Sequence, residues 1–210
     1  MYTSSRSPLA SRTASPIRRN SRVLCRARLH AGRGLRFLAG IGCLVFASTA
    51  QAQVRITEYM YSGPDGEFVE LTNVGGSPVD MTGWSYDDNS DTPGSFSLSE
   101  FGTVAPGESV IITESDAETF RTAWGLAGSV GILGGSGGVA AIGRNDAINL
   151  WDSSNTLVDR LQYGDQDFPG TIRTQDVSGW VCTQGLGDND AFKWTLAAAA
   201  DAQGSFTSTG

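Results

Sequence analysis

Short alternations of apolar and polar residues dominate most of this chain. In one such run, Val69 and Leu71 fall on the same face. Glu70 and Thr72 fall on the other, which is the period of two expected of a half-buried strand. Clusters of Gly, Pro, Asn and Asp separate the runs, as is typical of strands joined by turns. The predicted strands cover residues 54–61, 67–74, 79–86, 95–99, 108–114, 146–151 and 156–163, with shorter ones near 171–174 and 192–196.

One segment has helical spacing instead. Residues 115–118 read Ser-Asp-Ala-Glu, the pattern of a capping box, and Phe120 and Trp124 then lie four residues apart on one face. Gly125 is a natural stop. We therefore predict an all-β, antiparallel sandwich with one short helix covering one end. Phe68 makes the second face of its strand partly apolar, which predicts another packed layer there.

Six stretches of the sequence resemble the bacterial type of lamin tail domain. They are Ile56–Glu58, Glu67–Asn73, Val79–Trp84, Val104–Ile112, Asn145–Asp152 and Leu157–Gly164. The sequence departs from the family in a Gly-rich insertion and in Asn145-Asp146, where a Gly-Glu turn is more usual. The resemblance implies an immunoglobulin-like sandwich. It also implies an accessory module of the kind found beside secreted nucleases, phosphatases and other surface hydrolases.

The first 52 residues differ in kind from the rest. They contain nine arginines and no acid, followed by an apolar run over residues 35–47 that closes on Ala50-Gln51-Ala52. This order is typical of a secretory signal peptide, and the apolar run is shorter than the roughly 20 residues of a membrane span. The basic part is long for a signal peptide, which suggests a true start downstream of Met1. We therefore expect a signal peptide at 1–52, a lamin-tail-like sandwich at 53–174 and a partly packed tail at 175–210.

The net charge of the chain limits the kinds of partner that it could bind. From residue 53 on, six basic residues face all 22 acids, a net charge of −16. Nucleic acids require basic surfaces, so we expect no nucleic-acid binding, although Arg55, Arg144 and Arg160 could form a local patch. We expect no stable membrane insertion after cleavage.

The sequence also limits the chemistry. His30, the only histidine, lies in the leader, so catalytic sites that need an imidazole are excluded from the exported part. Carboxylate-only or oxygen-ligated metal chemistry remains, and we assign no catalytic, cofactor or metal residue. Cys182 is the only cysteine left, so it is either buried or able to cross-link a dimer.

Several acidic and Gly-rich stretches have two interpretations. Asp87, Asp88 and Asp91 could bind Ca²⁺ or form a solvated turn, and residues 188–190 repeat this choice. The eight glycines within residues 125–143 could cradle a phosphate, but without a Walker lysine a hairpin or surface loop fits better.

Glu58 and Asp159 alternate in phase with apolar residues, so both would point toward the core. Such acids can mark a functional site. Alternatively, they lie at strand ends, accept backbone N–H groups or are turned outward by a bulge.

The expected function is that of a secreted, extracellular or periplasmic, non-catalytic module that binds a protein or a cell-envelope component. The alternatives are a carboxylate- or metal-dependent hydrolase, or its accessory domain, and a Ca²⁺-stabilised adhesion domain. Within the fold, Leu71 and Ile148 should point into the core, whereas Glu67 should face solvent and tolerate Glu67→Ala.

Export makes the first testable prediction. Because Ala50 and Ala52 supply the small residues that signal peptidase requires, the exported protein should begin at Gln53. Amino-terminal sequencing of the exported form checks this, and an Arg-rich region still attached to exported protein would contradict it.

Overall fold

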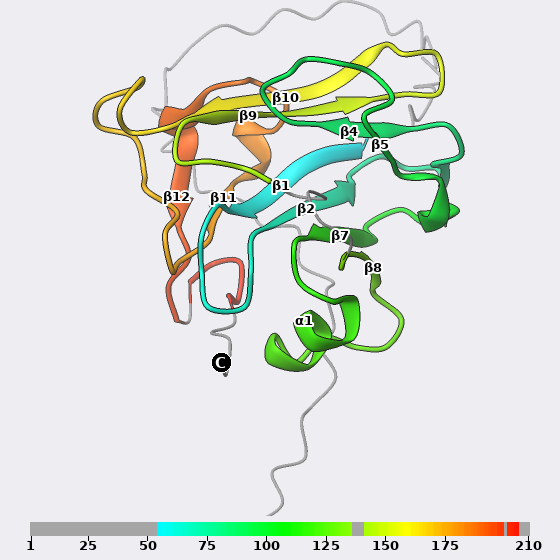
Figure 1. The fold of residues 1–210 in the computed structure, drawn as a ribbon, viewed down its shortest axis with the longest axis horizontal. Helices are drawn as coiled ribbons and strands as arrows, with labels where there is room; N and C mark the ends of the chain where they lie inside the picture. The colour runs from blue at the N-terminus through cyan, green and yellow to red at the C-terminus, as the bar shows by residue number, and fades with distance from the viewer. Residues whose placement is uncertain (1–53, 136–140, 200, 206–210) are drawn as a thin grey trace, which may run out of the picture.

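The two main sheets lie face to face in a computed structural model of the chain, which describes residues 54–135, 141–199 and 201–205 (Figure 1). The larger sheet has six strands in the order β12-β11-β1-β2-β7-β8. In chain order these are β1 (Val54–Met60), β2 (Phe68–Asn73), β7 (Ser109–Thr113), β8 (Gly131–Leu133), β11 (Gly179–Val181) and β12 (Trp194–Leu196). All neighbours are antiparallel except β7 and β8.

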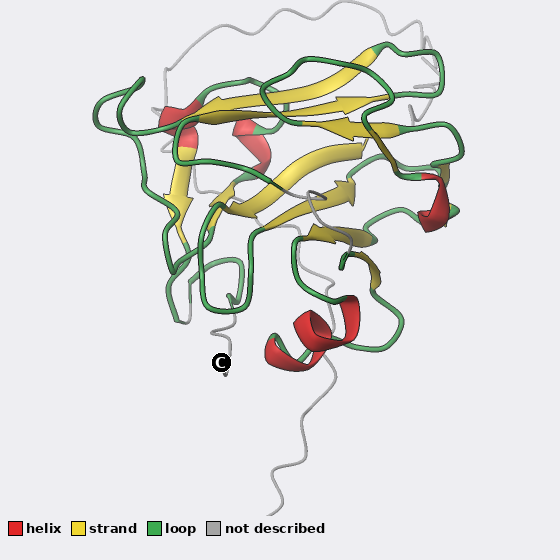
Figure 2. Ribbon diagram, viewed as in Figure 1, coloured by secondary structure: helices red, strands yellow, loops and turns green. Residues whose placement is uncertain are grey.

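The smaller sheet has four antiparallel strands in the order β10-β9-β4-β5. These are β4 (Ser85–Asp87), β5 (Phe96–Ser97), β9 (Asp146–Trp151) and β10 (Leu157–Tyr163). A separate pair joins β3 (Val79–Asp80) to β6 (Thr103–Val104). The helices in the described residues are α1 (Ala117–Ala123) and three single turns, η1 (Ser99–Phe101), η2 (Thr183–Gly185) and η3 (Ala191–Lys193) (Figure 2).

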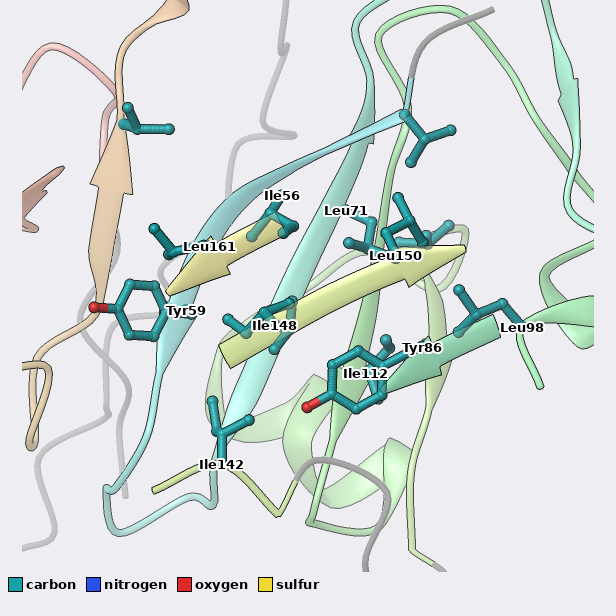
Figure 3. Packing of buried hydrophobic residues seen from close by; sticks show 14 of the residues in the cluster. Ile56, Tyr59, Leu71, Tyr86, Leu98, Ile112, Ile142, Ile148, Leu150 and Leu161 are labelled. Carbon is teal, nitrogen blue, oxygen red and sulfur yellow. The ribbon is translucent and has the colours of Figure 1, made fainter. Parts of the chain in front are cut away.

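The main core fills the space between the two sheets. Leu71 from β2 and Ile148 from β9 are fully buried in it, which confirms both sequence predictions. Figure 3 shows these side chains meeting from opposite sheets, with Ile142 closing one end. Period-two alternation therefore gave the correct inward face for both strands.

A second, smaller core lies on the outer face of the larger sheet. Phe120 of α1 packs edge to face on Phe68 of β2, with ring centroids 5.4 Å apart, and Trp124 does the same at 5.2 Å. Met60 and Ile111 complete the cluster. The apolar second face of β2 is thus explained. The predicted helix covers the outer face of this sheet, beside β7 and β8, and not one end of the sandwich as expected (Figure 1).

The helix begins one residue later than the predicted capping box. Asp116, not Ser115, is the N-cap, and its carboxylate accepts the N–H groups of Glu118 at 3.2 Å and Thr119 at 3.0 Å. Ser115 donates its hydroxyl to the carbonyl of Asp65 at 2.6 Å. A carboxylate cap also complements the helix dipole.

Parts of the strand prediction are wrong. The strand expected near 171–174 is absent, and β11, which pairs with β1, begins only at Gly179 and was not predicted. The expected strand 79–86 divides into β3 and β4 because Gly83 takes a positive φ of 77° in the turn between them. β8 lies inside the stretch predicted as a loop, where it pairs in parallel with the open edge of β7.

The core makes the second testable prediction. Leu71→Ala and Ile148→Ala should each lower the free energy of unfolding by about 2–5 kcal/mol, because each leaves a cavity in a close-packed interior. Val74→Ala is the control, since Val74 is 39% exposed. Denaturant unfolding measures all three. If Leu71→Ala were as stable as Val74→Ala, the assignment of the inward face of β2 would be wrong.

Candidate functional site

The acidic run Asp87–Asp91 is a hydrogen-bonded turn between β4 and β5. Asp87 is buried, and its carboxylate accepts the Ser90 hydroxyl at 2.7 Å and the Thr92 N–H at 2.6 Å. Asp88 accepts the Ser90 N–H at 3.0 Å. These oxygens are used to shape the turn.

Side chains of the smaller sheet hold the same turn in place. Arg160 of β10 forms an ion pair with Asp91 and donates to the side-chain oxygen of Asn149 at 2.6 Å. Asn149, buried on β9, donates in turn to the backbone carbonyl of Asp88. The run therefore covers the outer face of β9 and β10. Among the residues that the structure describes, no group of three or more His, Cys, Asp or Glu side chains is placed to hold a metal ion.

The second acidic run, residues 188–190, is also a structural turn. Asp188 forms an ion pair with Lys193, and Asp190 accepts the Phe192 N–H at 3.1 Å at the start of η3. Asn189 accepts the Gln162 N–H at 2.7 Å and so covers part of the open edge of β10. Covering an edge in this way blocks unwanted strand pairing.

Glu58 is buried, but a bulge turns it away from the main core. The register of β1 shifts between Ile56 and Glu58, so that Tyr59 takes the inward position. The carboxylate of Glu58 accepts the Ser178 hydroxyl at 2.6 Å and a bond from the Gln203 amide. The bulge is one of the three structural explanations left open by the sequence. The carboxylate also holds residue 203 of the tail, which is thus packed at this point.

Asp159 is buried and does point inward, in phase with Leu161 and Tyr163 of the core. One of its oxygens accepts the backbone N–H of Ile56 at 2.9 Å, and the other accepts the N–H of Arg160 at 2.9 Å. Burial raises the pKa of this carboxyl, while the bond from Ile56 opposes the rise. Accepting backbone N–H groups was another of these explanations, and it holds for Asp159.

A group of residues that sequence reasoning missed lies at the end of the sandwich near Ile142. The carboxylate of Glu67, just before β2, accepts the Ile142 N–H at 2.9 Å. Burial raises the pKa of Glu67 to about 7; the bond from Ile142 opposes the rise, and repulsion from Glu114 and Asp146 adds to it. The expectation that Glu67 simply faces solvent is therefore wrong, because the side chain is half-buried and bonded.

Two buried tyrosines belong to the same region. Tyr86 and Tyr163 are 3% and 2% exposed, and neither hydroxyl has a hydrogen-bond partner. Burial raises the pKa of each phenol, and the charges of Asp146 and Glu67 raise both further. Figure 3 shows the Tyr86 hydroxyl pointing toward the end closed by Ile142. No local sequence pattern identifies this group, because its members come from three strands and from three segments outside the strands.

The three arginines that could form a cationic patch each contact a different partner. Arg55 donates to the Val158 carbonyl, and Arg144 makes two bonds to Asp165, at 2.7 and 2.6 Å. Arg160 pairs with Asp91.

Two further sequence candidates remain. Cys182 is free and half-buried. The Gly-rich candidate is only partly within the described residues, since 136–140 lie outside them.

Asp159 makes the third testable prediction. Asp159→Ala removes the acceptor of a buried N–H group, so it should lower the free energy of unfolding by about 1–3 kcal/mol. Asp159→Asn keeps one acceptor oxygen and should lose less. Asp167→Ala, at an exposed residue, is the control. Equal stability of Asp159→Ala and Asp167→Ala in denaturant would show that the bond contributes nothing.

A comparison with known protein families agrees with the fold described above. The Lamin Tail Domain family matches residues 47–165, which include β1 to β10 and α1. No curated protein matches the chain closely enough to count as a relative. The match covers more than half of the chain, and the structure has the expected immunoglobulin-like β-sandwich. The chain therefore belongs to the lamin tail domain family.

Proposed function

We propose that this lamin tail domain is a non-catalytic module, exported from the cytoplasm, that binds a protein or a component of the cell envelope. The family and the fold alone do not specify this role, because one fold serves many functions. The proposal depends on how the chain uses its acids, on its charge and on the apolar side chains that it exposes.

The use of the acids supports a non-catalytic role. The exported part has no histidine, so a reaction would have to use carboxylates. Asp87 and Asp159, two of the acids that the sequence analysis singled out, are bonded to hydroxyl or backbone N–H groups that position strands and loops. Side chains held this way stabilise the fold and are poorly available to a substrate.

The observation that carries the binding proposal is a set of exposed apolar side chains near the carboxyl end. Phe192 of η3 is 63% exposed, the highest value among the large hydrophobic residues in the described part of the chain. Val177 and Leu196 are also exposed, and Leu196 lies on β12, the edge strand of the larger sheet. Exposed aromatic residues beside an edge strand are common in protein-binding surfaces.

Charge argues against nucleic acid as the partner. The exported part carries −16, and each of its six cations donates to an acceptor within the domain. A phosphate backbone would meet net repulsion, and binding would first have to break these contacts.

The location outside the cytoplasm is likewise part of the proposal. It is supported by the leader and its A-x-A site. Within residues 54–135, 141–199 and 201–205, no helix has the length and apolar character needed to cross a bilayer. We propose that the mature domain is extracellular or periplasmic.

Phe192 makes the fourth testable prediction. Purified protein is cross-linked to intact cells of the producing strain, and the captured partner is identified and its binding measured. Phe192→Ala should weaken binding at least about tenfold, because exposed aromatics often act as anchors at interfaces. Val74→Ala, at an exposed valine outside the carboxyl-terminal set, is the control and should bind normally.

The proposal would be contradicted if Phe192→Ala and Val74→Ala bound equally well, or if no partner were captured.

Fluorescence anisotropy with labelled duplex and single-stranded DNA across a salt series tests the expectation that the domain does not bind nucleic acid. Micromolar binding that weakens steeply with salt would overturn it.

A further inference from the structure

The strand β12 is an edge of the larger sheet, and within the described residues it pairs on one side only (Figure 1). In its antiparallel ladder with β11, Ala197 donates its N–H to the Ser178 carbonyl at 2.8 Å. Bonded and non-bonded pairs alternate along such a ladder. Thr195 therefore bonds to β11, whereas Trp194 and Leu196 turn their backbone groups away from it.

Three backbone groups remain at this open edge. The N–H of Trp194 donates to the Ala191 carbonyl of η3. The carbonyl of Trp194 and both the N–H and the carbonyl of Leu196 have no hydrogen-bond partner in the part of the chain that the structure describes. The side chain of Leu196 is exposed as well. An extended chain could therefore pair here as a further strand of the sheet.

The domain protects another open edge but not this one. On β10, the outermost strand of the smaller sheet, Asn189 accepts the Gln162 N–H at 2.7 Å and donates to the Gln162 side chain at 3.1 Å. Such cover is a common defence of edges, because an exposed edge pairs with other chains. The edge of β12 is left open beside Phe192, and this is the arrangement expected of a docking site.

Acidic side chains lie at both ends of the open edge. Before β12, Asp190 accepts the Phe192 N–H at 3.1 Å, and after it Asp201 accepts the Ala198 N–H at 3.1 Å. Within residues 176–201 one basic residue, Lys193, faces four acids, a net charge of −3, and Lys193 is held in an ion pair. A second copy of this acidic domain would be repelled here, whereas a basic chain would be attracted.

We propose that β12 is a docking edge for a basic, extended segment of a partner protein, which adds antiparallel to the larger sheet. The inference rests on the proposed binding function and specifies its mode and the chemistry of the partner. The incoming strand would exchange two hydrogen bonds with Leu196, as the residues of a bonded antiparallel pair do. Two basic side chains about six positions apart would span the distance between the acids at the two ends, at about 3.4 Å per residue.

The test uses the isotope-labelled protein in its exported form. The probe is a capped peptide of alternating threonine and valine with two arginines about six positions apart. Adding it should shift the backbone amide signals of residues 194–197, and the Leu196 amide should become protected from hydrogen exchange. The same peptide with glutamate in place of both arginines should bind at least about tenfold more weakly at low salt.

Two variants at one position isolate the backbone bond. Leu196→Pro removes the outward N–H and none of the bonds to β11, and proline is tolerated on an edge strand whose N–H faces solvent. Leu196→Ala also loses the leucine side chain but keeps the N–H. The arginine peptide should bind Leu196→Pro at least about tenfold more weakly than Leu196→Ala, because one acceptor of the peptide is left unpaired. Denaturant unfolding checks that both variants remain folded.

Equal binding of the arginine peptide by the two variants, or no shift of the signals of β12, would overturn the inference. The proposed function would still stand in that case if Phe192→Ala weakened binding of the partner captured from cells. Dimerisation of the protein that Leu196→Pro abolishes would assign the edge to a second copy of this chain, and would likewise overturn the proposal of a basic partner segment.

Discussion

A carboxylate of the smaller sheet, bonded to a backbone amide of the larger one, joins the two halves of this domain. Asp159 of β10 accepts the N–H of Ile56, where β1 has a bulge, and β10 has its own register shift just before Asp159. A bulge leaves ladder groups without a strand partner, and a buried N–H without an acceptor costs about 1–3 kcal/mol. Arg55, which donates to the Val158 carbonyl, makes the reciprocal contact. The two irregular strands thus satisfy each other across the core.

Carboxylates that accept unpaired backbone N–H groups also explain how a chain with so many acids can fold. Many of its strands have only two or three residues, so turns leave numerous N–H groups outside any ladder. Carboxylates that accept such groups belong to Glu67, Asp80, Asp87, Asp88, Glu108, Asp116, Asp146, Asp152, Asp159, Asp190 and Asp201. These are half of the 22 acids. Much of the acidity is therefore structural.

Local patterns predicted what depends on local geometry. The inward faces of β2 and β9 follow from alternation around Leu71 and Ile148, and α1 follows from the spacing of Phe120 and Trp124. Contacts between distant segments were not predictable. Glu67 looked like a solvent-facing strand start because its partner, Ile142, is 75 residues away. Likewise, β11 is too short to show a period and exists because β1 offers it an edge.

The central claim is that the bond from Ile56 to Asp159 is part of the cooperative core. The most direct test is hydrogen exchange of the Ile56 amide in the unmodified protein, compared with the fully buried Leu71 of β2. We predict that both amides exchange only through global unfolding, with opening free energies equal to the denaturant value. Exchange of Ile56 many times faster than that of Leu71 would contradict the claim, since it would show that the carboxylate does not hold β1 to the opposite sheet.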